Sequence, residues 1–311
     1  MNITSQMVKT LRDKTNAGMM DCKKALTECG GDIDKSVDWL RQKGLMTARK
    51  RAGRATREGL VLTKITGDGK VGAVVELNSE TDFVSKMDSF REITESLVDY
   101  LATAPQAPEN VEALLKAKCP KCGEEFGEVI NRAVGTTGEV IRLRRFKVIK
   151  AGPNGLVHGY VHAGGRLGVL VELEVEKPGP AADDLAHNLA MHVAAINPMA
   201  IKIEHLPEDF VAKERAVHEA KSKEELEAKA QKSPGKAPKN IEGLLANMVN
   251  GKMKKSFTEL VLLEQAYVKD PAKTVAALIS EAGKELGKIE VLSFARFQLG
   301  EEIEGENASE E

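Results

Sequence analysis

Two parts of the chain are copies of each other, so they must share one fold. Residues 59–61 (Gly-Leu-Val) return as residues 155–157, and the apolar segment 70–77 returns as the similar segment 166–173. Both pairs have the same offset (155 − 59 = 96 and 166 − 70 = 96). Similar segments at one fixed offset indicate two copies of a single folding unit, one after the other along the chain.

Each copy has the signals of a small antiparallel sheet. A glycine-containing turn, at residues 67–69 in the first copy and 163–165 in the second, separates two apolar strands. Each copy closes with a strand of alternating character, at residues 141–149 and 291–299. Helical patterns lie between the second and third strands. We therefore predict an α+β fold with two repeated subdomains, each with a three-stranded antiparallel sheet.

Composition excludes several classes of protein. The 311 residues are enough for two or more domains, and the 45 basic and 47 acidic residues leave a net charge of −2, which gives no general attraction to nucleic acid or membranes. No apolar stretch approaches the roughly 18 residues that span a bilayer, and the first residues lack the features of a signal peptide. Four cysteines do not make a disulfide framework. A cytoplasmic protein is expected.

The first 46 residues have the pattern of a separate three-helix module. The first helix ends near Gly18, the second ends at Gly30, and the third runs from Asp32 to Gly44. A module of this size more often holds a partner surface than an active site, because its core is small. The basic residues that follow suit either a solvated linker or a contact with an acidic partner.

The second copy carries a long polar insertion. Residues 207–256 are rich in Glu, Lys and Ala, and a turn at residues 233–238 divides them. Both halves are too polar to be buried, so we predict an antiparallel helical hairpin that projects into solvent, either as a stabilising element or as an arm that grips a partner. The predicted divisions are a helical module at 1–46, a linker at 47–57, core subdomains at 58–150 and 151–300, and an acidic disordered tail at 301–311.

The segment 78–84 is where the two copies differ most clearly. It joins an apolar strand to an amphipathic helical pattern, and Thr81 and Asp82 are residue types that cap helices. Phe83 has two interpretations. It either belongs to the buried stripe of that helix or is exposed for a function. The matching residue of the second copy is Gly179 (83 + 96), so the fold alone does not require a bulky side chain here.

The sequence offers little for catalysis or metal binding. There is no phosphate-binding Gly-x-x-x-x-Gly-Lys-[Ser/Thr] motif, and no paired carboxylates or Ser/Cys–His arrangement stands out, so we do not expect an enzyme. Cys119 and Cys122 resemble half of a zinc knuckle, but a structural zinc site needs four ligands, so they are weak metal candidates. His192 lies in an apolar helical segment and is a core or contact residue. No cofactor is expected.

Four motifs, in order along nearly the whole chain, resemble the bacterial elongation factor Ts family, the guanine-nucleotide exchange factors of elongation factor Tu. They are Val8-Lys9 with Thr15-x-Ala17 to Leu26, Thr81-Asp82-Phe83-Val84, Ala190 to Ala195, and Met253-Lys254-Lys255 with Pro271-x-Lys273-Thr274-Val275.

The resemblance implies a fold, a partner and a set of contact residues. The N-terminal module would be similar to ubiquitin-associated (UBA) domains, and the hairpin would be a coiled coil. Phe83, with Asp82 beside it, would enter an apolar pocket of the partner's GTPase domain and destabilise its magnesium and phosphate contacts. The family allows a dimer of heterodimers, and implies no direct binding of nucleotide, DNA or membrane. The implied contact residues are Thr81, Asp82, Phe83 and Val84 in the Mg²⁺-dislocating motif, Arg12, Met19 and Met20 in the module, and His192 in the second subdomain.

Two other functions remain open at this point. A chaperone or assembly factor could bind a GTPase through the module and the hairpin without accelerating nucleotide release. An adaptor for metal or nucleic acid would use the two cysteines at 119 and 122 or the basic residues at 49–57.

Overall fold

The two copies of the repeat form two three-stranded sheets with the same strand order. The computed structural model describes residues 3–15, 17–51, 54–232 and 240–302. The sheets have the orders β1-β2-β3 and β4-β5-β8, with the second strand of each copy in the middle. The central strands β2 and β5 are 96 residues apart at both ends, which confirms the repeat. The strands are β1 Glu58–Ile65, β2 Val71–Ser79, β3 Ile141–Lys150, β4 Gly155–His162, β5 Leu167–Val175 and β8 Ile289–Gln298.

The first sheet is antiparallel, and its central strand is buried on both faces. Leu60 pairs with Leu77, and Val75 pairs with Phe146. All residues of β2 after Val71 are buried. A strand buried on both faces reads as a continuous apolar run, and this explains the pattern from which the strand was predicted.

Two glycines let strands of the two copies approach closely. A Cβ atom added to Gly72 would lie 2.5 Å from a methyl carbon of Val157, and one added to Gly168 would lie 2.6 Å from a methyl carbon of Val61. These contacts are related by the repeat, because 72 + 96 = 168 and 61 + 96 = 157. Val61, Val74, Val157 and Leu170 form one buried cluster. The glycines are therefore needed for packing, since any side chain there would separate the strands.

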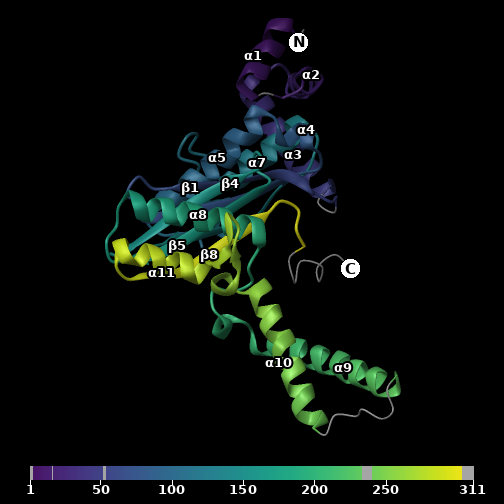
Figure 1. Ribbon diagram of the computed structural model, residues 1–311. Coiled ribbons are helices and arrows are strands. Elements are labelled where there is room, and N and C mark those ends of the chain that lie inside the picture. The colour runs from purple at the N-terminus through teal and green to yellow at the C-terminus, as the bar shows by residue number, and fades with distance from the viewer. Residues whose placement is uncertain (1–2, 16, 52–53, 233–239, 303–311) are drawn as a thin grey trace. The chain divides into compact units, whose positions relative to one another are not determined.

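Helices cover the other face of the first sheet (Figure 1). Phe90 and Leu97 of one helix and Phe126 of another are buried against the sheet residues Val75 and Leu77. The rings of Tyr100 and Phe126 pack edge to face, with their centroids 5.6 Å apart. These helices are α4 Asp82–Ser85, α5 Asp88–Thr103, α6 Val111–Lys116 and α7 Phe126–Thr137.

The N-terminal helices form a small cluster of their own. Leu11, Cys22, Ala25 and Leu26 are completely buried in it. The prediction that the third helix ends at Gly44 is wrong, because the helix continues through Arg51. An interior glycine costs a helix only about 1 kcal/mol relative to alanine, and good helix formers follow this one. The helices are α1 Ser5–Thr15, α2 Met19–Glu28 and α3 Ile33–Arg51.

The second copy has helices of its own. Leu185, Leu189 and Val193 of the long helix α8 are buried, and α11 lies beside α8 (Figure 1). The polar insertion forms two helices, α9 and α10, which contact each other through the bonds His218–Ser256 and Lys252–Glu225. The elements are α8 Pro180–Ile196, η1 Ile203–His205, α9 Glu208–Lys232, α10 Ile241–Leu260, η2 Leu262–Glu264, β6 Ala266–Tyr267, β7 Asp270–Thr274 and α11 Val275–Leu286.

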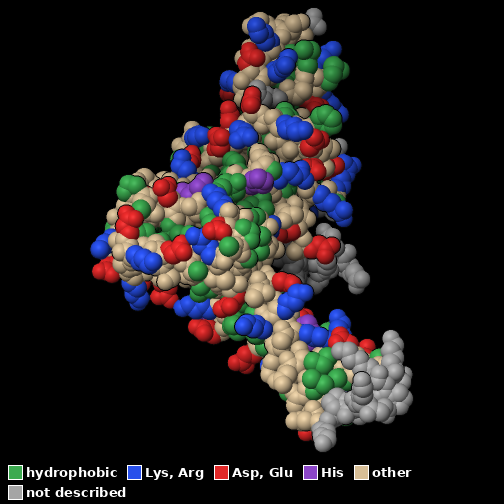
Figure 2. Space-filling model, in the orientation of Figure 1, with side chains coloured by type: hydrophobic (Ala, Val, Ile, Leu, Met, Phe, Trp, Pro, Cys, Tyr) green, Lys and Arg blue, Asp and Glu red, His purple; other side chains and the backbone are tan. Residues whose placement is uncertain are grey.

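By contacts, the chain divides into two compact units. The first contains Met1–Gly152, Leu156–Leu170 and Ala295–Glu311, and the second contains Pro153–Gly155 and Val171–Phe294. The predicted turn at 233–238 and most of the predicted acidic tail lie outside the described residues. None of the helices that the structure describes is long and apolar enough to cross a membrane. Basic and acidic side chains are intermixed on the visible face (Figure 2).

Candidate functional site

Phe83 is the most exposed large apolar side chain of the described residues. Its relative exposure is 80%, while the next residue, Val84, is 6% exposed and belongs to the core of the first sheet. The interpretation of Phe83 as a core residue is therefore wrong. Exposing an aromatic ring to water is unfavourable, so a ring held outside the core is a candidate for contact with another molecule.

A break in the helix explains why Phe83 points away from the core. The sequence pattern places Phe83, Met87 and Phe90 on one stripe of a continuous helix. Instead α4 ends at Ser85, and Met87 has extended backbone angles (φ −70°, ψ 139°) before α5 begins at Asp88. The break resets the helical register, so Phe90 is buried while Phe83 and Met87 are exposed.

The turn that carries Phe83 is held by side chains on both sides. The hydroxyl of Ser79 donates to the carbonyl oxygen of Thr81 (2.8 Å). The backbone N–H and the hydroxyl of Thr81 both donate to the carboxylate of Glu139, at 3.0 and 2.7 Å. The carboxylate of Glu80 accepts from the backbone N–H of Val140 at 2.8 Å. Thr81 does occupy the cap position of α4, but its hydroxyl bonds Glu139 and not the helix.

Asp82 forms an ion pair within α4. Its carboxylate lies 2.6 Å from the ammonium nitrogen of Lys86. This hydrogen bond lowers the pKa of the Asp82 carboxyl group. The residue beside the exposed ring is thus a charged carboxylate at neutral pH, and the ammonium that accompanies it is also exposed.

The second copy has no equivalent of this turn. After β5 ends at Val175, the backbone passes through Gly179 directly into the long helix α8, with Pro180 as its first residue. The short helix α4 is absent there. The two copies therefore differ in structure at the position where they differ in sequence.

The predicted contact residues of the N-terminal module are also at the surface. Met19 and Met20 start helix α2 and are 59% and 73% exposed. Arg12 is exposed on α1 and lines a groove together with Met87, which lies four residues after Phe83. The structure thus brings Arg12 close to the α4–α5 corner, although the two are far apart in the sequence.

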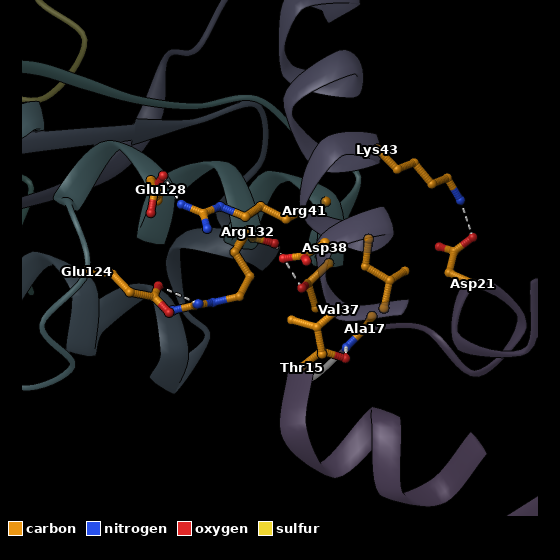
Figure 3. A pocket seen from close by; sticks show the side chains of 13 residues that line it. Thr15, Ala17, Asp21, Val37, Asp38, Arg41, Lys43, Glu124, Glu128 and Arg132 are labelled. Carbon is orange, nitrogen blue, oxygen red and sulfur yellow. Dashed lines mark hydrogen bonds and ion pairs between the residues drawn. The ribbon is translucent and has the colours of Figure 1, made fainter. Parts of the chain in front are cut away.

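Helix α3 of the module packs against α7, and a small cavity lies at this junction (Figure 3). Its volume is about 110 Å³, well below the roughly 300 Å³ at which ligand pockets begin. Charged residues at its rim pair with one another: Arg41 with Glu128, and Arg132 with Glu124. The cavity is part of the contact between α3 and α7, and it is too small for a nucleotide.

His192 is buried and holds a hairpin in place. Its Nδ1 accepts a hydrogen bond from the backbone N–H of Val268 (3.1 Å), so this nitrogen carries no proton. Nε2 then donates to the side-chain oxygen of Gln265 (2.9 Å). Burial lowers the pKa of His192, and the ring stays neutral. The surface that His192 supports is the β6–β7 hairpin, where Val268 is 38% exposed.

The two cysteines of the predicted half-knuckle lie in a tight turn. Cys119 is buried and Cys122 is exposed, and Gly123 closes the turn with a positive φ of 75°. Partial loss of hydration in the turn raises the pKa of the Cys122 thiol, although its side chain reaches the surface. Among the described residues, no group of three or more His, Cys, Asp or Glu side chains could hold a metal ion.

Sequence reasoning missed Glu80 and Glu139, which brace the exposed turn. Glu139 is 58 residues from Thr81, and nothing in its own neighbourhood marks it as functional. Its position just before the third predicted strand was the only clue, since a residue there lies beside the end of the antiparallel second strand. This clue places Glu139 near the turn at residues 80–84 but does not show that it bonds Thr81.

Comparison with known proteins assigns the chain to a family. A family model described as Elongation factor TS matches residues 80–301, which include Asp82 and Phe83. The chain belongs to the elongation factor Ts family. It is 41% identical to the elongation factor Ts of Nitratidesulfovibrio vulgaris (strain DP4) over 315 aligned positions, which cover all of both chains. The elongation factor Ts of Bdellovibrio bacteriovorus is 40% identical and covers 98% of this chain and 94% of its own. That of Clostridium novyi is 41% identical and covers 99% and 97%.

Proposed function

We propose that this chain is a cytoplasmic translation elongation factor that binds elongation factor Tu·GDP and promotes release of GDP. Family membership supports this role over the whole length of the chain. The observation that carries it is the ring of Phe83, which is 80% exposed although the next residue, Val84, is buried. No bond is made or broken in such an exchange, so the chain needs no catalytic residues and no cofactor.

The proposed mechanism is differential binding. A GTPase holds its nucleotide through phosphate, loop and magnesium contacts. A factor that binds the distorted, empty GTPase more tightly than the nucleotide-bound form weakens nucleotide binding by the same factor, because coupling between two ligands is reciprocal. Phe83 would supply this preference if its ring enters an apolar pocket of the GTPase domain that forms only after the partner's helices move.

The size of the effect follows from burial of the ring. Full burial of a phenylalanine side chain contributes about 1.5–3 kcal/mol, which corresponds to roughly 10- to 150-fold in an equilibrium constant. Asp82 would place a negative charge near the partner's magnesium and phosphates, and Thr81 and Val84 would fix the position of this pair. The movement of the partner's helices would then destabilise the magnesium site.

Other surfaces would provide affinity. In the proposed assignment, residues 1–46 form a UBA-like module that contacts the partner through Arg12, Met19 and Met20. The second subdomain, proposed at 151–300, would contact a different domain of the partner, and His192 would contribute through the β6–β7 hairpin that it supports. Helices α9 and α10 would form the coiled-coil hairpin of this subdomain.

The test is release of fluorescent GDP from elongation factor Tu, measured by stopped flow with and without this chain. We expect Phe83→Ala to slow the accelerated release at least tenfold. Glu112→Ala is the control, because Glu112 is an exposed residue of α6 outside the proposed contact surfaces, and its loss leaves the rate unchanged. Release at the original rate with Phe83→Ala would show that the ring does not act as a wedge.

The alternative function, a chaperone that binds the GTPase without exchange, gives a different result in the same experiment. It predicts a tight complex in which GDP leaves no faster than from the free GTPase. The family to which the chain belongs favours exchange.

A further inference from the structure

Two glutamates join the turn that carries Phe83 to the turn before β3. Glu139 accepts two hydrogen bonds from Thr81, one from the backbone N–H and one from the hydroxyl. In the opposite direction, Glu80 accepts from the backbone N–H of Val140. Each turn therefore supplies a carboxylate that bonds the backbone of the other. We call these three bonds the glutamate clasp.

The turn that holds Glu139 is itself fixed. Helix α7 ends at Gly138, whose φ of 74° lies in the left-handed region that favours glycine. The backbone N–H of Glu139 donates to the hydroxyl of Thr137 at 3.3 Å, and Val140 and Ile141 are buried. Glu139 is thus a fixed acceptor for the N–H and the hydroxyl of Thr81.

The clasp replaces the usual cap of helix α4. Thr81 is the N-cap residue, but its side chain makes no bond to the helix. A four-residue helix is too short to be stable alone, so its orientation depends on contacts outside it. The clasp supplies one such contact before Phe83, and buried Val84 supplies the other after it.

We propose that Glu139 and Glu80 are positioning residues that hold Phe83 in the orientation needed for nucleotide release. This inference rests on the proposed function. A ring that is already oriented loses less conformational freedom when it enters a pocket than a ring on a mobile turn. The glutamate clasp therefore affects the release of GDP, in which the ring enters its pocket. The initial binding of the partner depends on the other surfaces.

The first experiment measures GDP release at increasing concentrations of this chain. It separates an effect on the maximal release rate from an effect on binding of the partner. In Glu139→Gln, one of the two acceptor oxygens becomes an amide NH₂ and the negative charge is lost, so the charge-assisted bonds from Thr81 are weakened. We expect the maximal release rate to fall about fivefold to tenfold, while the half-saturating concentration changes less than twofold. Glu112→Gln, at an exposed glutamate of α6, is the matched control and changes neither value. An unchanged maximal rate in Glu139→Gln would overturn the proposal.

A double-mutant cycle tests whether the clasp acts through the ring. When Phe83→Ala is already present, adding Glu139→Gln should slow release no more than twofold further. An equal slowing with and without Phe83 would show that Glu139 acts independently, and would overturn the inference. If Phe83→Ala alone leaves release unchanged, the proposed function itself fails. If only Phe83→Ala slows release, the proposed function stands and the clasp does not.

A milder variant covers the case in which Glu139→Gln folds poorly. Thr81→Val keeps the size of the side chain and removes only the hydroxyl donor at 2.7 Å, so one of the three bonds is lost. We expect a twofold to fourfold lower maximal rate and an unchanged circular dichroism spectrum. A maximal rate equal to that of the unaltered chain would contradict a role for the clasp.

Discussion

At the scale of single residues, neighbouring side chains at the α4 turn have opposite tasks. Val84 is 6% exposed and joins the core under the first sheet, while Phe83 beside it is 80% exposed. In one turn of helix, adjacent residues point about 100° apart, so burying the smaller side chain directs the larger one outward. The apolar residue that stabilises the fold is thus valine, and the one available for contact is phenylalanine.

This division predicts opposite outcomes for two alanine substitutions. Val84→Ala removes buried carbon atoms and leaves a small cavity, so the free energy of unfolding should fall by about 2 kcal/mol. Phe83→Ala removes a side chain from the surface, so the change should stay within about 0.5 kcal/mol. Urea denaturation followed by circular dichroism measures both. A loss above about 1.5 kcal/mol in Phe83→Ala would mean that the ring packs against the chain after all.

At the scale of elements, the sequence predicted strands well and helix ends less well. The repeat located both sheets because a strand buried on both faces has a clear apolar run, as in residues 73–75. The break between α4 and α5 was missed, because Lys86 and Met87 are ordinary helix residues and no glycine or proline marks the site. Tertiary packing accompanies this break: Val84 before it and Phe90 after it are both buried in the core of the first sheet, which local sequence cannot reveal.

The candidate site could also be predicted only in part. The sequence identified Phe83 as unusual by comparing it with Gly179 of the second copy. It gave no means of choosing between a buried and an exposed ring, since that depends on where the helix breaks. His192 illustrates the opposite case. Its apolar helix indicated burial, but its hydrogen bond to Val268 comes from a hairpin 76 residues away.

The β6–β7 hairpin depends on neutral His192, and this predicts a pH dependence. The folded-state pKa of His192 is lowered from 6.5 by burial. Below about pH 6.5 the unfolded chain therefore binds a proton that the folded chain does not accept. The free energy of unfolding is unaffected by this proton above about pH 6.5, and it falls by up to about 1.4 kcal/mol for each pH unit below that value. His192→Gln should flatten the dependence of the unfolding free energy on pH between pH 7 and 5.

The control for this experiment is His205→Gln, because His205 is an exposed histidine of the same unit. It should leave the pH dependence as it is in the unaltered chain. Equal slopes in all three proteins would show that the buried imidazole does not control the acid sensitivity. Hydrogen exchange of the Val268 amide gives a local reading, since its bond to Nδ1 must break when that nitrogen is protonated.

At the scale of the whole molecule, the first compact unit takes residues from both ends of the chain. Residues 295–302 join it although they follow most of the second copy. Part of the reason is Leu299, which is buried in the same cluster as Val61 and Val157. Gly72 and Gly168 have no side chains and let the strands of this cluster pack closely. In the sequence these glycines only weaken the strand prediction. The structure shows that they allow the close contact between the strands.

Buried Glu76 ties the end of the chain to the first sheet. It is fully buried in β2, and its carboxylate accepts from Arg144 at 3.2 Å and from Arg145 at 2.7 Å. It also accepts from the backbone N–H of Gly300, just after the last strand, at 3.1 Å. One acidic side chain thus satisfies two largely buried guanidinium groups and the backbone of a segment 224 residues away.

Removing this carboxylate should destabilise the whole first unit. Glu76→Ala removes a carboxylate that two largely buried arginines share, and loss of one member of a buried ion pair typically costs about 3–5 kcal/mol. We expect about 3 kcal/mol, since Glu301 still pairs with Arg145. Glu76→Gln keeps one acceptor for Gly300 and should lose less. Urea denaturation measures both against Glu112→Gln, which should change stability by less than about 0.5 kcal/mol. A loss below about 1 kcal/mol in Glu76→Ala would mean that the packing of Val61, Val74, Val157 and Leu170 holds the end of the chain without the ion pairs.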